Sequence, residues 1–323
     1  MPAPRCSEKQ FIETWEGLGS PSKVATALGQ DLRSVMARRK DIEKRTGRPL
    51  VAWASDRPSL RAPVHYALDD HPSIRNSQIE NGTVLVASDC HYWPGIVTTA
   101  HRAFVLFCEH MKPSAVILNG DVLDGATISR HAPIGWEGRP SLIQEIEACA
   151  DRLEEIEKAA PKGASFIWTL GNHDGRFETR LATVAPEYAK LKGVHLKDHF
   201  PRWTPAWAAW INNEVVIKHR WKGGLHATHN NTVSAGKTMV TGHLHSLKVT
   251  PYSDYNGTRF GVDTGTLAEP YGPQSIDYTE SNPVNWRSGF AVLTFKEGRL
   301  LWPEVCHVLE DGLVEFRGEL IRV

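Results

Sequence analysis

Short apolar runs alternate with longer amphipathic stretches through the middle of the chain. The runs at 83–88, 115–119 and 165–170 are rich in β-branched and large apolar residues, which is typical of buried strands. The stretches at 97–111 and 141–160 place their apolar residues at helical spacing. This alternation predicts an α/β domain in which helices cover a largely parallel sheet.

After residue 210 the pattern changes to strands with few helix-sized gaps between them. The expected strands span 214–219, 238–241, 259–263, 289–295 and 300–308. Just before them, Trp203, Trp207 and Trp210 have the spacing of one helical face. Such a face predicts packing under a loop, with stacking on a nucleobase as the alternative.

The first 50 residues have a helical pattern of their own. Phe11, Trp15 and Leu18 predict a first helix, and the stretch 19–22 ends it and offers a cap for a second helix. Gly29 ends that second helix, and a third, basic helix follows from about Leu32. Two short helices joined by a turn that contains Gly form a helix-turn-helix pattern.

A Pro-, Ser-, Asp- and Arg-rich stretch separates the helical segment from the strand-rich region. It runs over residues 51–82 and has little periodicity, so it predicts a linker. We therefore divide the chain into a small all-α module at 1–50, a linker at 51–82 and an α/β domain at 83–323.

Charge is distributed unevenly between these parts. The 323 residues contain 37 Lys and Arg against 37 Asp and Glu, a formal net charge of zero. Residues 1–50 hold ten basic and six acidic side chains, a net of +4, so the rest of the chain carries −4. Four basic residues of the third helix are candidate DNA contacts: Arg33, Arg38, Arg39 and Lys40. The alternative is a small solvated three-helix module with a charged surface.

Composition and cysteine spacing favour a reducing compartment. The five cysteines are odd in number and show no Cys-x-x-Cys spacing, which predicts free thiols. The longest weakly polar stretch is too short to span a bilayer, and no signal peptide is visible at residues 1–9. We expect a cytoplasmic protein without a membrane partner.

Side chains that bind metals follow the predicted strands. Five segments carry them: Asp89-Cys90-His91, Gly120-Asp121-Val122-Leu123-Asp124, Gly171-Asn172-His173-Asp174, Lys218-His219 and Gly242-His243-Leu244-His245. In α/β sheets, ligand-binding residues collect at the carboxyl ends of the strands, so these segments are expected to converge. Mixed carboxylate, imidazole and amide groups suit two divalent transition-metal ions better than one structural zinc.

These blocks, in this order, resemble the signature of the calcineurin-like metallophosphoesterases over roughly residues 83–308. The resemblance implies a four-layer α/β/β/α sandwich and hydrolysis of phosphate esters with two divalent metal ions. Mn²⁺ is the first expectation for these ions, with Fe²⁺, Ni²⁺, Co²⁺ or Zn²⁺ as alternatives.

The resemblance also implies a role for each motif residue. The first metal would be held by Asp89, His91 and His245, the second by Asn172, His219 and His243, and Asp121 would bridge both. His173 would donate a proton to the leaving oxygen, and Asp174 would orient its imidazole. Asp124 would be a partner behind the ligands or a turn-forming residue.

The fourth block leaves alternatives open. Arg220 follows His219 where the family usually has Gly, so His226 and His229 compete with His219 for the ligand role. Candidate substrate contacts are His226, His229, Asn230, Arg220 and Trp93.

Together these features predict a dinuclear metal-dependent phosphoesterase that hydrolyses phosphodiester bonds of DNA. Ala25, Gly29 and Val35 have the spacing of helix-turn-helix modules and resemble those of phage-encoded proteins, which implies a host cytoplasm. Two alternatives remain. One is a phosphatase or cyclic-nucleotide phosphodiesterase acting on small molecules or phosphoproteins, and the other is a non-enzymatic DNA-binding regulator.

Overall fold

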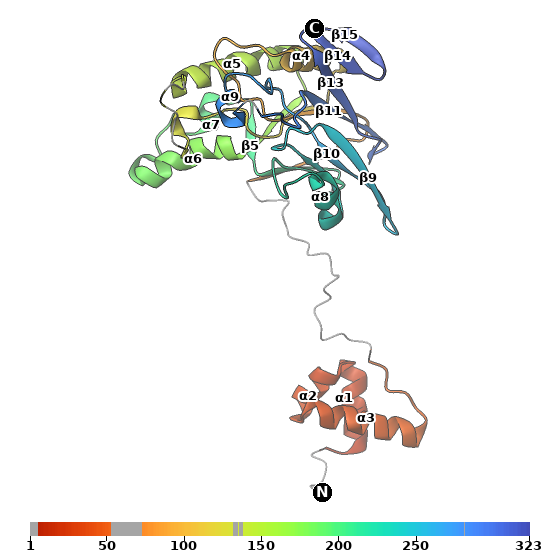
Figure 1. Cartoon of the computed structure of the whole chain (residues 1–323). Helices are drawn as coiled ribbons and strands as arrows, with labels where there is room; N and C mark the ends of the chain where they lie inside the picture. Colours follow the sequence, from red (N-terminus) through yellow and green to blue (C-terminus); the bar gives the residue numbers. More distant parts are fainter. Residues whose placement is uncertain (1–5, 53–72, 132–134, 136–137, 281) are drawn as a thin grey trace. The chain divides into compact units, whose positions relative to one another are not determined.

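The chain divides into two compact units, Met1–Leu68 and Asp69–Val323, each with its own hydrophobic core. The structure is a computed structural model and describes residues 6–52, 73–131, 135, 138–280 and 282–323 (Figure 1). Most of the predicted linker, residues 53–72, lies outside the described residues.

The first unit contains the three predicted helices: α1 (Glu8–Leu18), α2 (Pro21–Leu28) and α3 (Leu32–Thr46). The side chains of Ser7, Ser20 and Asp31 cap their N-termini by accepting backbone N–H groups. A buried core of Phe11, Trp15, Val24, Val35 and Ile42 joins them.

Two of the four candidate DNA-binding residues, Arg38 and Arg39, lie against this core. The guanidinium of Arg38 lies 5.0 Å from the Phe11 ring and donates to the carbonyl oxygen of Cys6 at 2.9 Å. Arg39 lies 4.9 Å from the Trp15 ring and donates to Glu43 at 3.0 Å. Arg33 and Lys40 are exposed. The basic helix therefore has one face that stabilises the module and another that is free to meet a partner.

The second unit is built on two sheets. Within the described residues, the larger sheet has the order β15-β14-β13-β11-β2-β3-β4-β5, with β12 paired to β11. Its strands are β2 (Gly82–Ala87), β3 (Ala115–Leu118), β4 (Ser165–Thr169), β5 (Thr204–Ala206), β11 (Gly289–Lys296), β12 (Arg299–Leu300), β13 (Glu304–Glu310), β14 (Leu313–Phe316) and β15 (Glu319–Arg322). The pairs from β2 to β5 are parallel, whereas the pairs from β2 to β15 are antiparallel.

The smaller sheet has the order β1-β6-β7-β8-β10-β9 among the described residues. Its strands are β1 (Ile74–Ser77), β6 (Ala208–Ile211), β7 (Val215–Ile217), β8 (Thr238–Thr241), β9 (Lys248–Asp254) and β10 (Gly257–Asp263). β7 and β10 are both parallel to β8, so their carboxyl ends lie at the same edge.

Helices complete the layers. The longer ones are α4 (Thr99–Met111), α5 (Leu142–Ala159), α6 (Asn172–Val184) and α8 (Ala227–Ala235), and the short ones are η2 (Ala126–Ile128), η3 (Pro186–Tyr188), α7 (Leu196–His199) and α9 (Ile276–Thr279). Phe104 of α4 and Leu153 of α5 pack on one face of the large sheet, and Val86, Val240 and Leu293 fill the space between the sheets. α8 covers β8, β9 and β10 on the far side (Figure 1). This order of layers confirms the predicted α/β/β/α sandwich.

Two local expectations are wrong. The second unit begins before residue 83, because β1 pairs in parallel with β6 and adds an edge strand from the predicted linker. The three tryptophans do not share a helical face, because β5 and β6 occupy this segment. Trp203 is buried, while Trp207 is 55% exposed.

The expectation for the cysteines holds in the described residues. All five cysteines are described, buried and free, as their spacing predicts. None of the helices in the described ranges combines the length and apolarity needed to cross a membrane.

A buried histidine makes the stability of the second unit depend on pH. His101 lies 2.8 Å from Glu155 Oε2 and 3.0 Å from the Tyr92 hydroxyl, and burial lowers its pKa from 6.5 to about 4. The unfolded chain therefore takes up this proton near pH 6.5 and the folded chain only near pH 4. The contribution of His101 to stability is complete above pH 6.5 and is lost as the pH falls toward 4.

We expect the free energy of urea unfolding to fall by about 2 kcal/mol more in wild type than in His101→Gln between pH 7.5 and pH 5. This estimate follows because each pH unit below 6.5 costs about 1.4 kcal/mol. Equal losses in the two proteins would show that His101 does not titrate in this way.

Candidate metal centre

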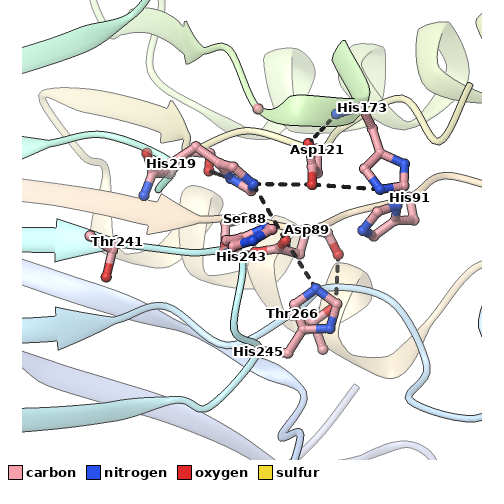
Figure 2. A network of polar contacts seen from close by, with 12 residues as sticks. Ser88, Asp89, His91, Asp121, His173, His219, Thr241, His243, His245 and Thr266 are labelled. Carbon is pink, nitrogen blue, oxygen red and sulfur yellow. Dashed lines mark hydrogen bonds and ion pairs between the residues drawn. The ribbon is translucent and has the colours of Figure 1, made fainter. Parts of the chain in front are cut away.

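The five motif segments meet at one edge of the paired sheets. β2, β3 and β4 end just before Asp89, Asp121 and Asn172, and β7 and β8 end just before His219 and His243. Figure 2 shows side chains from all five segments around a common space: Asp89, His91, Asp121, His173, His219, His243 and His245. Parallel neighbours bring their carboxyl ends together, so the sequence segments converge as expected.

Asp89, His91 and His245 form the first group of candidate ligands. Each offers one ligand atom, and these atoms all lie within 4.8 Å of one another. His245 Nε2 is 3.0 Å from Asp89 Oδ1, and all three side chains are buried. One cation can therefore contact all three.

A second group contains Asp121, His219 and His243, again with ligand atoms within 4.8 Å. His219 Nε2 is 3.0 Å from Asp121 Oδ2 and 4.0 Å from Asp89 Oδ1, so the two groups adjoin (Figure 2). His219 Nδ1 lies 2.7 Å from the carbonyl oxygen of Asn119, which fixes the ring and leaves Nε2 facing the carboxylates.

Several ligand atoms lack hydrogen-bond partners in the described part of the chain. Three buried atoms have no hydrogen-bond partner there: Asp89 Oδ1, Asn172 Oδ1 and His219 Nε2. Two of them have ionisable neighbours, because Asp89 Oδ1 is 3.0 Å from His245 Nε2 and His219 Nε2 is 3.0 Å from Asp121 Oδ2. Leaving such atoms unsatisfied is costly. Divalent cations would satisfy all three, so the residues present fit a metal centre.

The backbone at the site is strained. Asp89, His91, Asp121, His243 and His245 have positive φ angles of 52°, 39°, 52°, 70° and 53°. Side chains of L-residues rarely adopt this left-handed region, and each instance costs on the order of 1–3 kcal/mol. The surrounding sheets therefore hold the backbone of these five candidate ligands in a conformation that L-residues disfavour.

Two motif glycines allow close approaches. At Gly120, where φ is 86°, a Cβ would lie 2.4 Å from His219 Nδ1. At Gly171 a Cβ would lie 2.0 Å from Asp121 Oδ1. Both positions require Gly because a side chain would displace a candidate ligand.

Charges in the site are strongly coupled. Burial opposes ionisation of Asp89, but His245 and His219 more than offset it and lower its pKa to about 2. Burial also disfavours a charged His219, yet Asp121 and Asp89 raise its pKa to about 10. His91 behaves similarly: hydrogen bonding and charge from Asp124 overcome burial and raise its pKa to about 9. Metal binding must therefore displace protons from these imidazoles.

The expected role of Asp174 needs correction. Its carboxylate is fully buried and accepts hydrogen bonds from the backbone N–H groups of Asp121, Val122, Leu123 and Gly171, at 2.7–3.1 Å, and from the Trp168 indole at 2.9 Å. These donors occupy both oxygens, so Asp174 holds the loop that carries Asp121 and does not orient His173.

Asp124 orients His173 instead. His173 Nδ1 lies 2.7 Å from the carbonyl oxygen of Asp124 and 3.2 Å from its Oδ1. The same Oδ1 lies 2.9 Å from His91 Nδ1. One carboxylate thus positions a candidate ligand and the candidate proton donor.

Two further positioning residues were missed in the sequence. Asp263 ends β10 and accepts from the backbone of Ser246 and Leu247 at 2.9 and 3.2 Å, behind His245. Burial raises its pKa to about 6. Asp263 stands at the end of a predicted strand, as the motif residues do, so the sequence could have indicated it as a site residue. Arg176, which lies 3.0 Å from His173 Nδ1 through its NH1, sits one helical turn after that histidine and gave no such signal.

The structure separates the rival fourth-block residues. His219 lies in the cluster, whereas His226, His229 and Asn230 are exposed at the start of α8, outside the cavity formed by the described residues. Arg220 is exposed. The pKa of His243 is lowered mainly by burial and by the neighbouring His219, and the charge of Arg220 adds a smaller effect in the same direction. A cavity of about 420 Å³ lies over the ligand cluster, and Trp93 is one of the residues that line it.

Comparison with known proteins agrees with this geometry. The sequence model of the calcineurin-like phosphoesterases matches residues 82–260, more than half of the chain. The chain belongs to this family. Membership makes this protein a metal-dependent phosphoesterase with divalent metal ions at the site.

This phosphoesterase is also similar to the Gene 54 protein of Mycobacterium phage L5. The two are 24% identical over 234 residues, which cover 64% of this chain and 87% of the relative.

Among solved structures, Vps29 from Entamoeba histolytica with Zn²⁺ covers 74% of the phosphoesterase and 98% of its own chain, at 13% identity and a TM-score of 0.40. A dimetal phosphatase from Danio rerio covers 76% and 99%, at 11% identity and a TM-score of 0.37.

Proposed function

We propose that this phosphoesterase hydrolyses phosphodiester bonds of DNA and that its N-terminal module binds the DNA. The observation that carries the proposal is a basic face on α3. Arg33, Lys40 and Lys44 follow one another at intervals of seven and four residues, which places them on one side of the helix. All three are exposed, and none has an ion-pair partner among the described residues. Helices that contact DNA present such unpaired basic side chains to phosphates.

The turn between α2 and α3 supports the same proposal. It consists of residues 29–31, and Gly29 has a φ of 61°. A tight turn containing Gly between two helices is typical of helix-turn-helix modules. Arg33 and Lys40 remain candidate contacts and Lys44 joins them, whereas Arg38 and Arg39 pack within the bundle and are set aside.

At the metal centre, the first ion would be held by Asp89, His91 and His245, and the second by Asn172, His219 and His243, with Asp121 between them. When bound, two divalent ions supply positive charge for the phosphate oxygens and an activated water nucleophile. Mn²⁺ is the expected ion, because mixed oxygen and imidazole ligands suit it, and Fe²⁺, Ni²⁺, Co²⁺ or Zn²⁺ are alternatives.

His173 supplies the proton in this mechanism. Its backbone N–H donates to Asp121 Oδ1 at 2.8 Å, and Asp124 accepts from Nδ1, so we assign Nε2 as the ring atom that gives a proton to the leaving oxygen. Nε2 lies 4.0 Å from Asp121 Oδ2, at the edge of the proposed metal centre.

The metal ligands weigh differently on the alternative functions. A non-enzymatic regulator is disfavoured because the family's ligand set is intact and clustered. A phosphatase or a cyclic-nucleotide phosphodiesterase uses the same ligands and is separated from the proposal only by substrate. The phage relative supports a role in the cytoplasm of a bacterial host.

One comparison tests the DNA proposal in the full-length protein. Replacing Arg33, Lys40 and Lys44 with Gln is expected to weaken DNA binding and to reduce the slope of log affinity against log salt by up to about 3, roughly one per lost phosphate contact. Fluorescence anisotropy with a labelled oligonucleotide measures both, while gel analysis with Mn²⁺ records cleavage. Lys9→Gln/Lys23→Gln, on exposed positions of α1 and α2, is the matched control. No DNA cleavage by the wild type, or equal binding by all three proteins, would contradict the proposal.

A further inference from the structure

Three aromatic rings form a row that leads away from the metal centre. The centre of the Trp286 ring lies 4.5 Å from that of the His245 ring. The Tyr278 ring is stacked with Trp286, with ring centres 6.2 Å apart and an angle of 12° between the two planes. Exposure increases along the row: His245 is 9% exposed, Trp286 is half-buried and Tyr278 is 82% exposed. A large ring that is so exposed, yet aligned with a second ring, presents a flat face to whatever occupies the site.

All three rings line the cavity over the ligand cluster. The cavity, of about 420 Å³, also receives His173 and the guanidinium of Arg176. Arg176 lies 3.0 and 3.3 Å from the two ring nitrogens of His173, so a positive charge sits beside the proposed proton donor. One cavity therefore combines a flat aromatic face, a cation and the metal centre. Its volume is at the small end for ligand sites.

We infer that Trp286 and Tyr278 are a stacking platform for an unpaired nucleobase, and that the enzyme acts on nucleotides outside a double helix. This inference rests on the proposed function and deepens it. Aromatic side chains bind single strands by stacking on bases, because every base has a π-face. A nucleotide joins such a face to a phosphate, which Arg176 and the metal centre attract.

A paired base does not meet these requirements. Inside a duplex both faces of a base are already stacked, and its phosphate stands apart from any free face, so an enzyme must first extract the base. A single-stranded segment or an unpaired terminal nucleotide avoids that cost. A cavity of about 420 Å³ has room for one nucleotide.

Three esters with the same leaving group test the platform. Thymidine 5′-(p-nitrophenyl) phosphate offers a base, ethyl p-nitrophenyl phosphate offers none, and phenyl p-nitrophenyl phosphate offers a ring without a nucleoside. With Mn²⁺ bound, we expect wild type to prefer the thymidine ester over the ethyl ester by about tenfold or more in kcat/KM. Tyr278→Ala should reduce this ratio by about tenfold, whereas Tyr278→Phe should keep it because the phenyl ring still stacks. Tyr255→Ala, at a fully exposed tyrosine of the β9–β10 turn, is the matched control and should behave as wild type.

Oligonucleotides complete the test. Wild type should cleave a single strand at least tenfold faster than the same sequence in a blunt duplex, and Tyr278→Ala should lose most of that preference. If the esters are hydrolysed but the ratio is near one, if the phenyl ester matches the thymidine ester, or if Tyr278→Ala keeps the ratio, the platform is wrong while the phosphoesterase function stands. If metal-loaded protein hydrolyses none of the esters, the proposed function itself fails.

Discussion

Replacing His173 with Asn is expected to slow hydrolysis of an alkyl phosphodiester by about 10²–10⁴-fold. The same change should slow a p-nitrophenyl ester by no more than about tenfold. An alkoxide is a poor leaving group and needs the proton that Nε2 of His173 provides, whereas p-nitrophenolate leaves without it. Steady-state kinetics on dithymidine phosphate and thymidine 5′-(p-nitrophenyl) phosphate measure the two losses with the same nucleoside in the site.

Neighbouring carboxylates provide the controls for this prediction. Asp124→Asn should show a weaker dependence on the leaving group, because its carboxylate contacts both the His173 ring at 3.2 Å and the candidate ligand His91 at 2.9 Å, so part of the loss falls on both esters. Asp174→Asn should affect both esters equally, because Asp174 binds the loop that holds Asp121 and does not contact the His173 ring. Equal losses on both esters in His173→Asn would exclude this residue as the acid.

Replacing Asp121 with Ala is expected to reduce turnover of every ester by on the order of 10³-fold or more. Asp121 is the carboxylate that lies between the two ligand groups, and loss of a bound ion removes several kcal/mol of charge stabilisation from the transition state. The expected companion result is the loss of at least one equivalent of metal after dialysis, measured by elemental mass spectrometry. Asp151→Ala, at an exposed position of α5, is the matched control.

The same samples give a pH dependence. His219 and His91 have pKa values raised to about 10 and about 9, so both carry protons at neutral pH that an ion must displace. Apparent metal affinity should therefore rise as the pH increases from 6 to 9, and isothermal titration calorimetry in two buffers should detect proton release. An Asp121→Ala protein that keeps two ions and full turnover would refute the assignment of the bridging carboxylate.

The position of the site could be predicted from the sequence, because each motif directly follows a buried strand. Strand ends are fixed by hydrophobic patterning, and parallel pairing brings Asp89, Asp121 and Asn172 together without further information. The same reasoning favours His219 over His226 and His229, because His219 directly follows a strand, and the structure places it in the cluster.

The roles of Asp124 and Asp174 could not be read in this way. Which of them faces His173 depends on the path of the loop after β3, where Asp121 has a positive φ and turns the backbone back on itself. Spacing in the sequence does not specify such a turn. Trp286 and Tyr278 were missed because they come from a connection between β10 and β11 that carries no motif, and they meet the site only through the fold.

Short elements were the other source of error. β1 has four residues and lies in a stretch rich in polar residues and Pro, so its apolar pattern is too brief to detect. In the segment 203–211, side chains alternate between buried and more exposed positions along β6, and tertiary pairing with β1 and β7 overrides the helical spacing of the tryptophans.

The separate hydrophobic cores of the two units have an evolutionary consequence. Phe11, Trp15 and Val35 belong to a core whose residues all come from the first unit, so substitutions there do not alter the core of the catalytic fold. Selection can therefore alter or exchange the N-terminal unit while the hydrolytic chemistry is inherited unchanged. Related chains that keep the same metal ligands are free to diverge in the sequence of this unit.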